Sequence, residues 1–356
     1  MTTVPLESSD MLQKVMDFPD QVANSYLLTT NSQISTLKLS RKVSNIVILG
    51  MGGSGIAGDF ARVLAKNSVP IHVCKNSVPP RFVNDETLVI AVTYSGKTRE
   101  TLHALDVSIS SGAMTIVVTS SLELGSVCGK RNIPWIAIPG NSYPRISIGY
   151  MLIPILAILH RIGVVDRIDS DISETVPILA KIRDECGPNV PPESNPAHLL
   201  ALALAKGFPI IFGEYDFTDV VALRWKQLLN ENSKAHCYCD TFPELLHNEI
   251  EAWGLDNGSM RDSAMLVLLR DAAHELETDL SARIETAKEI IKNRGGMVFE
   301  LWSTGKCELA RLLSLSYLGD FVSTYLAMLK GVDPVDIHNI ELVKNIGLAN
   351  PDPKIV

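Results

Sequence analysis

Short runs of uniformly apolar residues, many of them β-branched, alternate along the chain with segments of helical pattern. In the first half the apolar runs are residues 45–49, 71–74, 87–92, 115–119 and 135–138. Strands that are apolar on both faces are typical of a parallel sheet with helices packed on both sides. The alternation therefore predicts an α/β, doubly wound fold.

The same plan recurs in the second half, where 208–213, 264–269 and 297–301 are the apolar runs. Two "strand, glycine, helix" openings, at Gly50 and Gly213, indicate two domains of similar topology. Residues 184–196 are rich in proline and polar side chains, as an inter-domain connection would be. We expect a helical lead-in over 1–40, a first domain over 41–183, a linker over 184–196 and a second domain with C-terminal helices over 197–356.

The composition is that of an ordinary globular protein, with 46% hydrophobic and 20% charged residues, and it excludes a disordered, collagen-like or coiled-coil chain. A formal charge of −8 argues against nucleic acid as a partner. The start has neither a basic segment nor an apolar run, so we expect a cytoplasmic protein with reduced cysteines. The apolar stretch 145–161 contains Pro154 and is too short to span a bilayer, so we expect a buried helix and no membrane association.

Gly50–Gly55 fits the pattern GxGxxG between a strand and a helix, which we expect from Asp59, and this indicates a dinucleotide-binding turn. That interpretation also requires an acidic residue near the end of the second strand, and 71–76 has none. Lys75 could serve a cofactor with a 2′-phosphate, so the dinucleotide alternative stays open. A tight glycine turn without a ligand is the remaining possibility.

A second loop favours a different anion. Thr93–Thr98 (TYSGKT) also follows an apolar strand and precedes a helix, and it brings three hydroxyl groups around one glycine. Helix N-termini attract anions, and hydroxyl groups add hydrogen-bond donors. Two such loops at neighbouring strand ends suit a compact phosphomonoester better than a pyrophosphate.

The two loops together, GMGGSGIAGD and TYSGKTRET, resemble the sugar isomerase (SIS) domain, a phosphosugar-binding α/β unit. The second half adds NENSK at 230–234, FPE at 242–244, HNEI at 247–250 and GVDP at 331–334. With these the chain resembles the bifunctional phosphoglucose/phosphomannose isomerases, which carry two SIS domains. The resemblance implies interconversion of glucose 6-phosphate, and of mannose 6-phosphate, with fructose 6-phosphate through a cis-enediolate, without a cofactor or a metal.

The resemblance also implies roles for individual residues. Glu231 matches the base that moves a proton between C2 and C1, and Arg145 matches the cation that stabilises the enediolate. His247 matches the ring-opening histidine, which the partner subunit supplies in this family, so a homodimer is implied. The residues that match the substrate-binding positions are Gly52, Gly53, Ser54, Thr93, Ser95, Thr98 and Lys344.

One departure concerns substrate range. The family has a hydroxyl residue near the DP motif that is associated with mannose 6-phosphate, whereas 333–338 has no Ser or Thr. The sequence therefore supports glucose 6-phosphate as a substrate more strongly than mannose 6-phosphate. A non-catalytic phosphosugar-binding regulator and another SIS-type isomerase remain as alternatives.

A metal site is also conceivable, because four potential zinc ligands fall within twelve residues. Their spacing matches no standard zinc pattern, and we expect no metal. These residues are His236, Cys237, Cys239 and His247.

Overall fold

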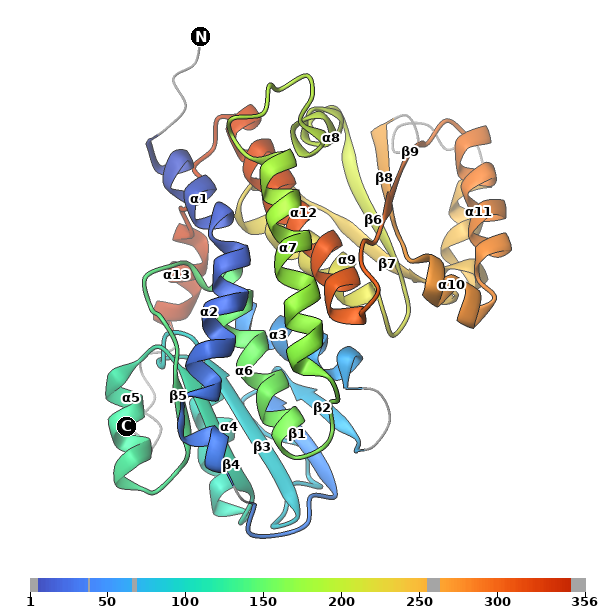
Figure 1. Ribbon diagram of the computed structural model, residues 1–356. Coiled ribbons are helices and arrows are strands. Elements are labelled where there is room, and N and C mark those ends of the chain that lie inside the picture. Colours follow the sequence, from blue (N-terminus) through green and yellow to red (C-terminus); the bar gives the residue numbers. More distant parts are fainter. Residues whose placement is uncertain (1–5, 38, 66–68, 255–262, 347–356) are drawn as a thin grey trace. The chain divides into compact units, whose positions relative to one another are not determined.

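The computed structural model describes residues 6–37, 39–65, 69–254 and 263–346, and it contains two parallel sheets flanked by helices (Figure 1). The described chain forms two compact units. The unit with the first sheet comprises Phe18–Ser173 and the segment that starts at His338; we call it the first-sheet unit. The second-sheet unit comprises Glu174–Ile337 and the segment that ends at Asp17. The predicted α/β class is confirmed.

The first sheet has the strand order β2-β1-β3-β4-β5, and all its strands are parallel. The expected strands of this half are confirmed to within one residue at each end. The chain leaves β1 toward one edge and later returns to β3 on the other side of β1. The point of reversal between these two strands is where ligands bind in open α/β sheets. The strands are β1 (Asn45–Leu49), β2 (Ile71–Cys74), β3 (Thr87–Thr93), β4 (Met114–Thr119) and β5 (Trp135–Ala137).

Helices cover both faces of the first sheet. Val47 and Val89 belong to the face that packs against α4 and α5, in one cluster with Leu105 and Leu124. The opposite face meets α3, because a Cβ on Gly58 would lie 2.9 Å from Ile48. The helices of this unit are α2 (Phe18–Thr30), α3 (Gly53–Leu64), α4 (Arg99–Ser110), α5 (Leu122–Lys130), α6 (Ile148–Arg161) and α13 (His338–Ile346), with short 3-10 turns η1 (Gln33–Thr36) and η2 (Pro144–Ile146).

The second sheet has the order β7-β6-β8-β9, again parallel throughout, which repeats the order of the first four strands of the first sheet. Three of its strands were predicted, and β7 was missed. This strand lies at the sheet edge, and only Phe242 among its five residues is buried, so it has no continuous apolar run. The strands are β6 (Phe208–Glu214), β7 (Tyr238–Phe242), β8 (Ala264–Arg270) and β9 (Met297–Trp302).

The longest helix, α12, is the core helix of the second-sheet unit. Its length and hydropathy would allow it to cross a membrane, but 83% of its apolar window is buried within the fold, where it packs on α1, α8 and α9. It is therefore explained as a core helix. The remaining helices are α1 (Leu6–Met16), α7 (Ile168–Cys186), α8 (Pro196–Leu204), α9 (Asp219–Glu231), α10 (Ala272–Thr278), α11 (Ser281–Asn293) and α12 (Glu308–Lys330), with η3 (Glu244–His247) and η4 (Glu249–Trp253).

Candidate active site

The loop after β1 turns sharply into α3. Gly52 has a φ of 52°, in the left-handed region that glycine adopts without strain, and α3 begins at the next residue. The helix therefore starts six residues before the expected Asp59. A Cβ on Gly53 would lie 2.6 Å from the carbonyl oxygen of Pro144, so only glycine allows this loop to approach the segment that carries Arg145.

The loop after β3 makes the corresponding turn into α4. Gly96 has a φ of 67°, and a Cβ there would lie 2.3 Å from that of Ser121. Thr98 is the N-cap residue of α4, yet its side chain makes no capping bond. The Ser95 hydroxyl is exposed and accepts a bond from the Lys97 amide at 3.2 Å. Thr93 is 1% exposed, and its Oγ1 has no hydrogen-bond partner among the described residues.

Hydrogen bonds join these two loops to the segment before α6. The Tyr94 amide donates to the Ser54 hydroxyl at 3.4 Å, and the Ser142 amide donates to the Tyr94 hydroxyl at 3.1 Å. Arg145 is 8% exposed, and its guanidinium lies 5.3 Å from the centre of the Tyr143 ring. The carboxyl edge of the first sheet thus gathers two helix N-termini, several hydroxyl groups and a buried cation, an arrangement suited to a phosphate group. The sequence-predicted residues found there are Gly52, Gly53, Ser54, Thr93, Ser95, Thr98 and Arg145.

Glu231 belongs to the second-sheet unit, where it is the last residue of α9 and half-buried. Buried polar contacts fix the chain that follows it. The Asn232 side-chain amide donates to the Ser323 hydroxyl at 3.0 Å, and the Ser233 hydroxyl donates to the Ser323 carbonyl at 2.7 Å. The end of α9 is therefore held firmly against α12.

The other two predicted residues are exposed. His247 ends η3 in the second-sheet unit, next to Asn248, whose side chain donates to Glu244 at 3.2 Å. Lys344 lies in α13 of the first-sheet unit. The catalytic and binding roles of all these residues remain predictions.

The carboxyl edge of the second sheet is built differently, and sequence reasoning missed it, since its only local signal is an acid at the end of an apolar run. Glu214 ends β6, is 0% exposed, and accepts a hydrogen bond from the Asp271 amide at 2.9 Å. Burial raises the pKa of Glu214 to about 8; the amide bond opposes this rise, and the negative charges of Glu275 and Asp271 add to it. This edge thus gathers buried carboxyl groups paired with arginines, Glu275 with Arg270 and Asp271 with Arg311.

Glu214 should make the stability of the protein pH-dependent. The folded state keeps this proton up to about pH 8, whereas an ordinary glutamate loses it near 4.5. Between pH 4.5 and about pH 8 the folded state therefore binds more protons than the unfolded state. The contribution of Glu214 to stability is largest below pH 4.5 and is lost toward pH 8, by at most about 1.4 kcal/mol per pH unit. Urea unfolding of the wild type and of Glu214→Gln at pH 5.5, 7 and 8.5 should show the variant gaining relative stability as the pH rises. A difference that does not change with pH would contradict this.

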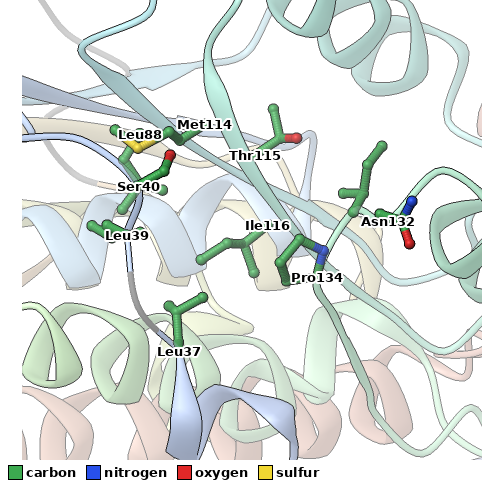
Figure 2. Close-up of a pocket in the computed structure, with 10 residues that line it drawn as sticks. Leu37, Leu39, Ser40, Leu88, Met114, Thr115, Ile116, Asn132 and Pro134 are labelled. Atoms are coloured by element: carbon green, nitrogen blue, oxygen red, sulfur yellow. The ribbon is translucent and has the colours of Figure 1, made fainter.

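A pocket of about 210 Å³ lies in the first-sheet unit (Figure 2), and no residue of the loops after β1 and β3 is among its described lining residues. It lies at the amino end of β3 and β4, and its lining residues within the described ranges carry no charged side chain. It is lined by Leu37, Leu39, Ser40, Leu88, Met114, Thr115, Ile116, Asn132, Ile133 and Pro134. Within the described ranges, no three His, Cys, Asp or Glu side chains gather as metal ligands would.

Fold and site define a class: an α/β protein with two doubly wound units, one of which has a phosphate-type edge at its point of reversal. Residues 193–346 match the family model of the bacterial phospho-glucose isomerase C-terminal SIS domain. A bifunctional phosphoglucose/phosphomannose isomerase from Caldicellulosiruptor bescii is 37% identical over 338 residues, which cover 94% of this chain and 98% of that relative. An Aquifex aeolicus protein of the same description is 31% identical over 302 residues, which cover 84% of this chain and 89% of the relative.

Solved structures agree with this fold. A hypothetical protein from Thermus thermophilus superimposes with a TM-score of 0.71 at 17% identity, over 96% of this chain and 91% of that one. The chain belongs to the bifunctional phosphoglucose/phosphomannose isomerase family.

Proposed function

We propose that the protein is an aldose–ketose isomerase that interconverts fructose 6-phosphate with glucose 6-phosphate and mannose 6-phosphate through a cis-enediolate. The observation that carries the proposal is the phosphate-type edge of the first sheet. It has two helix N-termini, the Arg145 guanidinium, and the Thr93 hydroxyl, which has no hydrogen-bond partner within the described residues. Membership of the isomerase family supports it.

Ring opening, proton transfer between C2 and C1, and stabilisation of the enediolate each have a proposed residue. His247 moves the proton of the ring oxygen when the sugar ring opens, since an imidazole gives and takes protons near neutrality. The Glu231 carboxylate removes the proton from C2 and returns it to C1, and the reverse transfer regenerates the aldose. The Arg145 guanidinium stabilises the negative charge that develops on the enediolate oxygens.

NMR of fructose 6-phosphate incubated with the purified, EDTA-treated protein in D2O tests this function. Formation of glucose 6-phosphate and mannose 6-phosphate with deuterium at C2 is expected. Glucose 6-phosphate alone would restrict the substrate range, in keeping with the missing hydroxyl residue at 333–338. Binding without turnover would favour a phosphosugar-binding regulator.

The buried hydroxyl of Thr93 should matter for substrate binding and not for folding. Thr93→Val removes a hydroxyl that has no partner in the described chain, so we expect a melting temperature equal to that of the wild type or higher. If this hydroxyl donates to the substrate phosphate, the KM for fructose 6-phosphate should rise about tenfold with little change in kcat.

Thr119→Val is the matched control for this variant. Thr119 ends the neighbouring strand β4 and is equally buried, but its hydroxyl accepts a bond from the Ser121 amide at 3.1 Å. This control should lower the melting temperature and leave KM unchanged. An unchanged KM in Thr93→Val would remove Thr93 from the phosphate site.

We propose further that the protein is a cytoplasmic homodimer to which each chain supplies His247 for its partner. The family resemblance and the exposure of His247 support this. We also propose that the chain carries two SIS domains, one built around each sheet. The shared order of four strands in the two sheets supports this division.

A further inference from the structure

Lys234 joins the end of the Glu231 helix to the turn that follows α12. Its ammonium group donates to the carbonyl oxygens of Glu231 at 2.8 Å, Asp333 at 2.6 Å and Asp336 at 2.7 Å. An ammonium group has three protons, so three carbonyl acceptors can engage all of them. One exposed lysine thus connects segments that are 99 and 102 residues apart in sequence.

The backbone explains why the side chain of Lys234 reaches back to α9. Lys234 has a φ of 50°, in the left-handed region, which ends the helical path three residues after Glu231. A cation at this end of a helix is also favoured by the partial negative charge of the last carbonyls. The side chains of Asn232 and Ser233 also bind Ser323 of α12, so the backbone just before Lys234 has little freedom.

The Glu231 carbonyl is therefore fixed by a contact that the helix itself does not provide. The placement of the Glu231 carboxylate decides how fast a proton is transferred, because misplacement by about 1 Å can cost a hundredfold in rate. It also decides from which face C2 of the planar enediolate is reprotonated, and the two faces give the glucose and the mannose configuration. A change in this placement should alter both the rate and the ratio of products.

We infer that Lys234 is a positioning residue for Glu231, which holds the Glu231 carbonyl and the 333–336 turn together. The inference rests on the isomerase function proposed above. Lys234 would not touch the substrate; it would act through the main chain of the base.

Lys234→Met tests the inference, because methionine keeps an apolar stem and removes the ammonium group. We expect kcat for fructose 6-phosphate to fall about tenfold, KM to change less than about twofold, and the initial ratio of mannose to glucose 6-phosphate to change about threefold. Lys234→Arg, which keeps a cation with several donors, should recover most of kcat and the original ratio.

Lys330→Met is the matched control. Lys330 is the exposed last residue of α12 and donates to the Lys234 carbonyl at 3.3 Å, so its replacement removes a cation from the same junction without touching Glu231. Wild-type kcat and product ratio are expected. If Lys234→Met does not fold, Lys234→Gln, which keeps two amide protons, should show a smaller change in the same direction.

The outcomes separate this inference from the proposed function. A wild-type protein that does not isomerise fructose 6-phosphate overturns the proposed function and the inference with it. An active wild type, together with a folded Lys234→Met or Lys234→Gln chain of unchanged kcat and product ratio, overturns the inference alone. The inference is also overturned if the rates of formation of both products fall equally and their ratio is unchanged, because a smaller folded fraction gives that result.

Discussion

Glu231→Gln is expected to lower kcat for fructose 6-phosphate about a thousandfold, with the affinity for the sugar phosphate changed no more than a few-fold. The amide has nearly the shape of the carboxylate, but it cannot accept the C1 proton of fructose 6-phosphate. Glu231 is half-buried at the end of α9, and glutamine is nearly isosteric with it, so the fold should be unaffected. Initial rates, together with the uptake of deuterium at C2 from D2O, measure the effect.

Glu289→Gln provides the control for charge. Glu289 is an exposed residue of α11 that pairs only loosely with Lys292, at 3.9 Å, so its neutralisation should leave kcat unchanged. Full turnover by Glu231→Gln would exclude Glu231 as the base.

The same variant tests whether His247 acts across the dimer. Chains with Glu231→Gln and chains with His247→Ala should each be inactive, whereas a heterodimer of the two should regain one working site in two. This follows because one of its sites combines the intact Glu231 of one chain with the intact His247 of the other. An inactive heterodimer of confirmed composition would place both groups in the same chain.

Arg224→Met should cost the second-sheet unit about 3–5 kcal/mol of unfolding free energy, because it leaves a buried charge without its partner. Arg224 lies in α9, is 1% exposed, and donates to the Asp320 carboxylate of α12 at 2.8 Å and to the Ser316 carbonyl at 3.4 Å. Removal of the guanidinium leaves Asp320, which is 2% exposed, without this ion pair. Urea unfolding followed by tryptophan fluorescence gives the free energy.

A second substitution separates the ion pair from simple packing. In Arg224→Met with Asp320→Leu both charges are gone and the volume is largely kept, so the double variant should be more stable than Arg224→Met alone. If the two losses simply add, the pair does not act as a unit and the effect of Arg224 is due to packing. A cost below about 1 kcal/mol for Arg224→Met would contradict a buried ion pair at this position.

Sequence patterns predicted those elements whose residue types alone carry a clear local signal. Eight of the nine strands in the described residues are short apolar runs, and the two loops of the phosphate-type edge combine glycines with hydroxyl residues at strand ends. The strand β7 was missed because a sheet edge with one buried residue imposes no apolar pattern. The end of α9 at Glu231 has no local signal, since nothing in the residue types shows that Lys234 adopts a left-handed backbone.

Contacts between segments distant in sequence could not be predicted. The hydrogen bond from the Ser142 amide to the Tyr94 hydroxyl joins the segment before α6 to the loop after β3, and no pattern in the sequence indicates it. The three carbonyl acceptors of Lys234 are backbone atoms, which every residue type provides. The burial of Glu214, and with it the raised pKa of its carboxyl group, depends on the packing of β6 and β8 and not on the neighbouring residues in the chain.

The long helix α12 has a consequence for the order in which the protein is made. The strands and helices of Phe18–Ser173 are complete long before residues 308–330 leave the ribosome, an interval on the order of ten seconds at ordinary rates of synthesis. During that time α1, α8 and α9 have no α12 to pack on, and their apolar faces stay open to chaperones or to other nascent chains. Premature termination before Glu308 would therefore leave the apolar faces of α1, α8 and α9 without the helix that covers them.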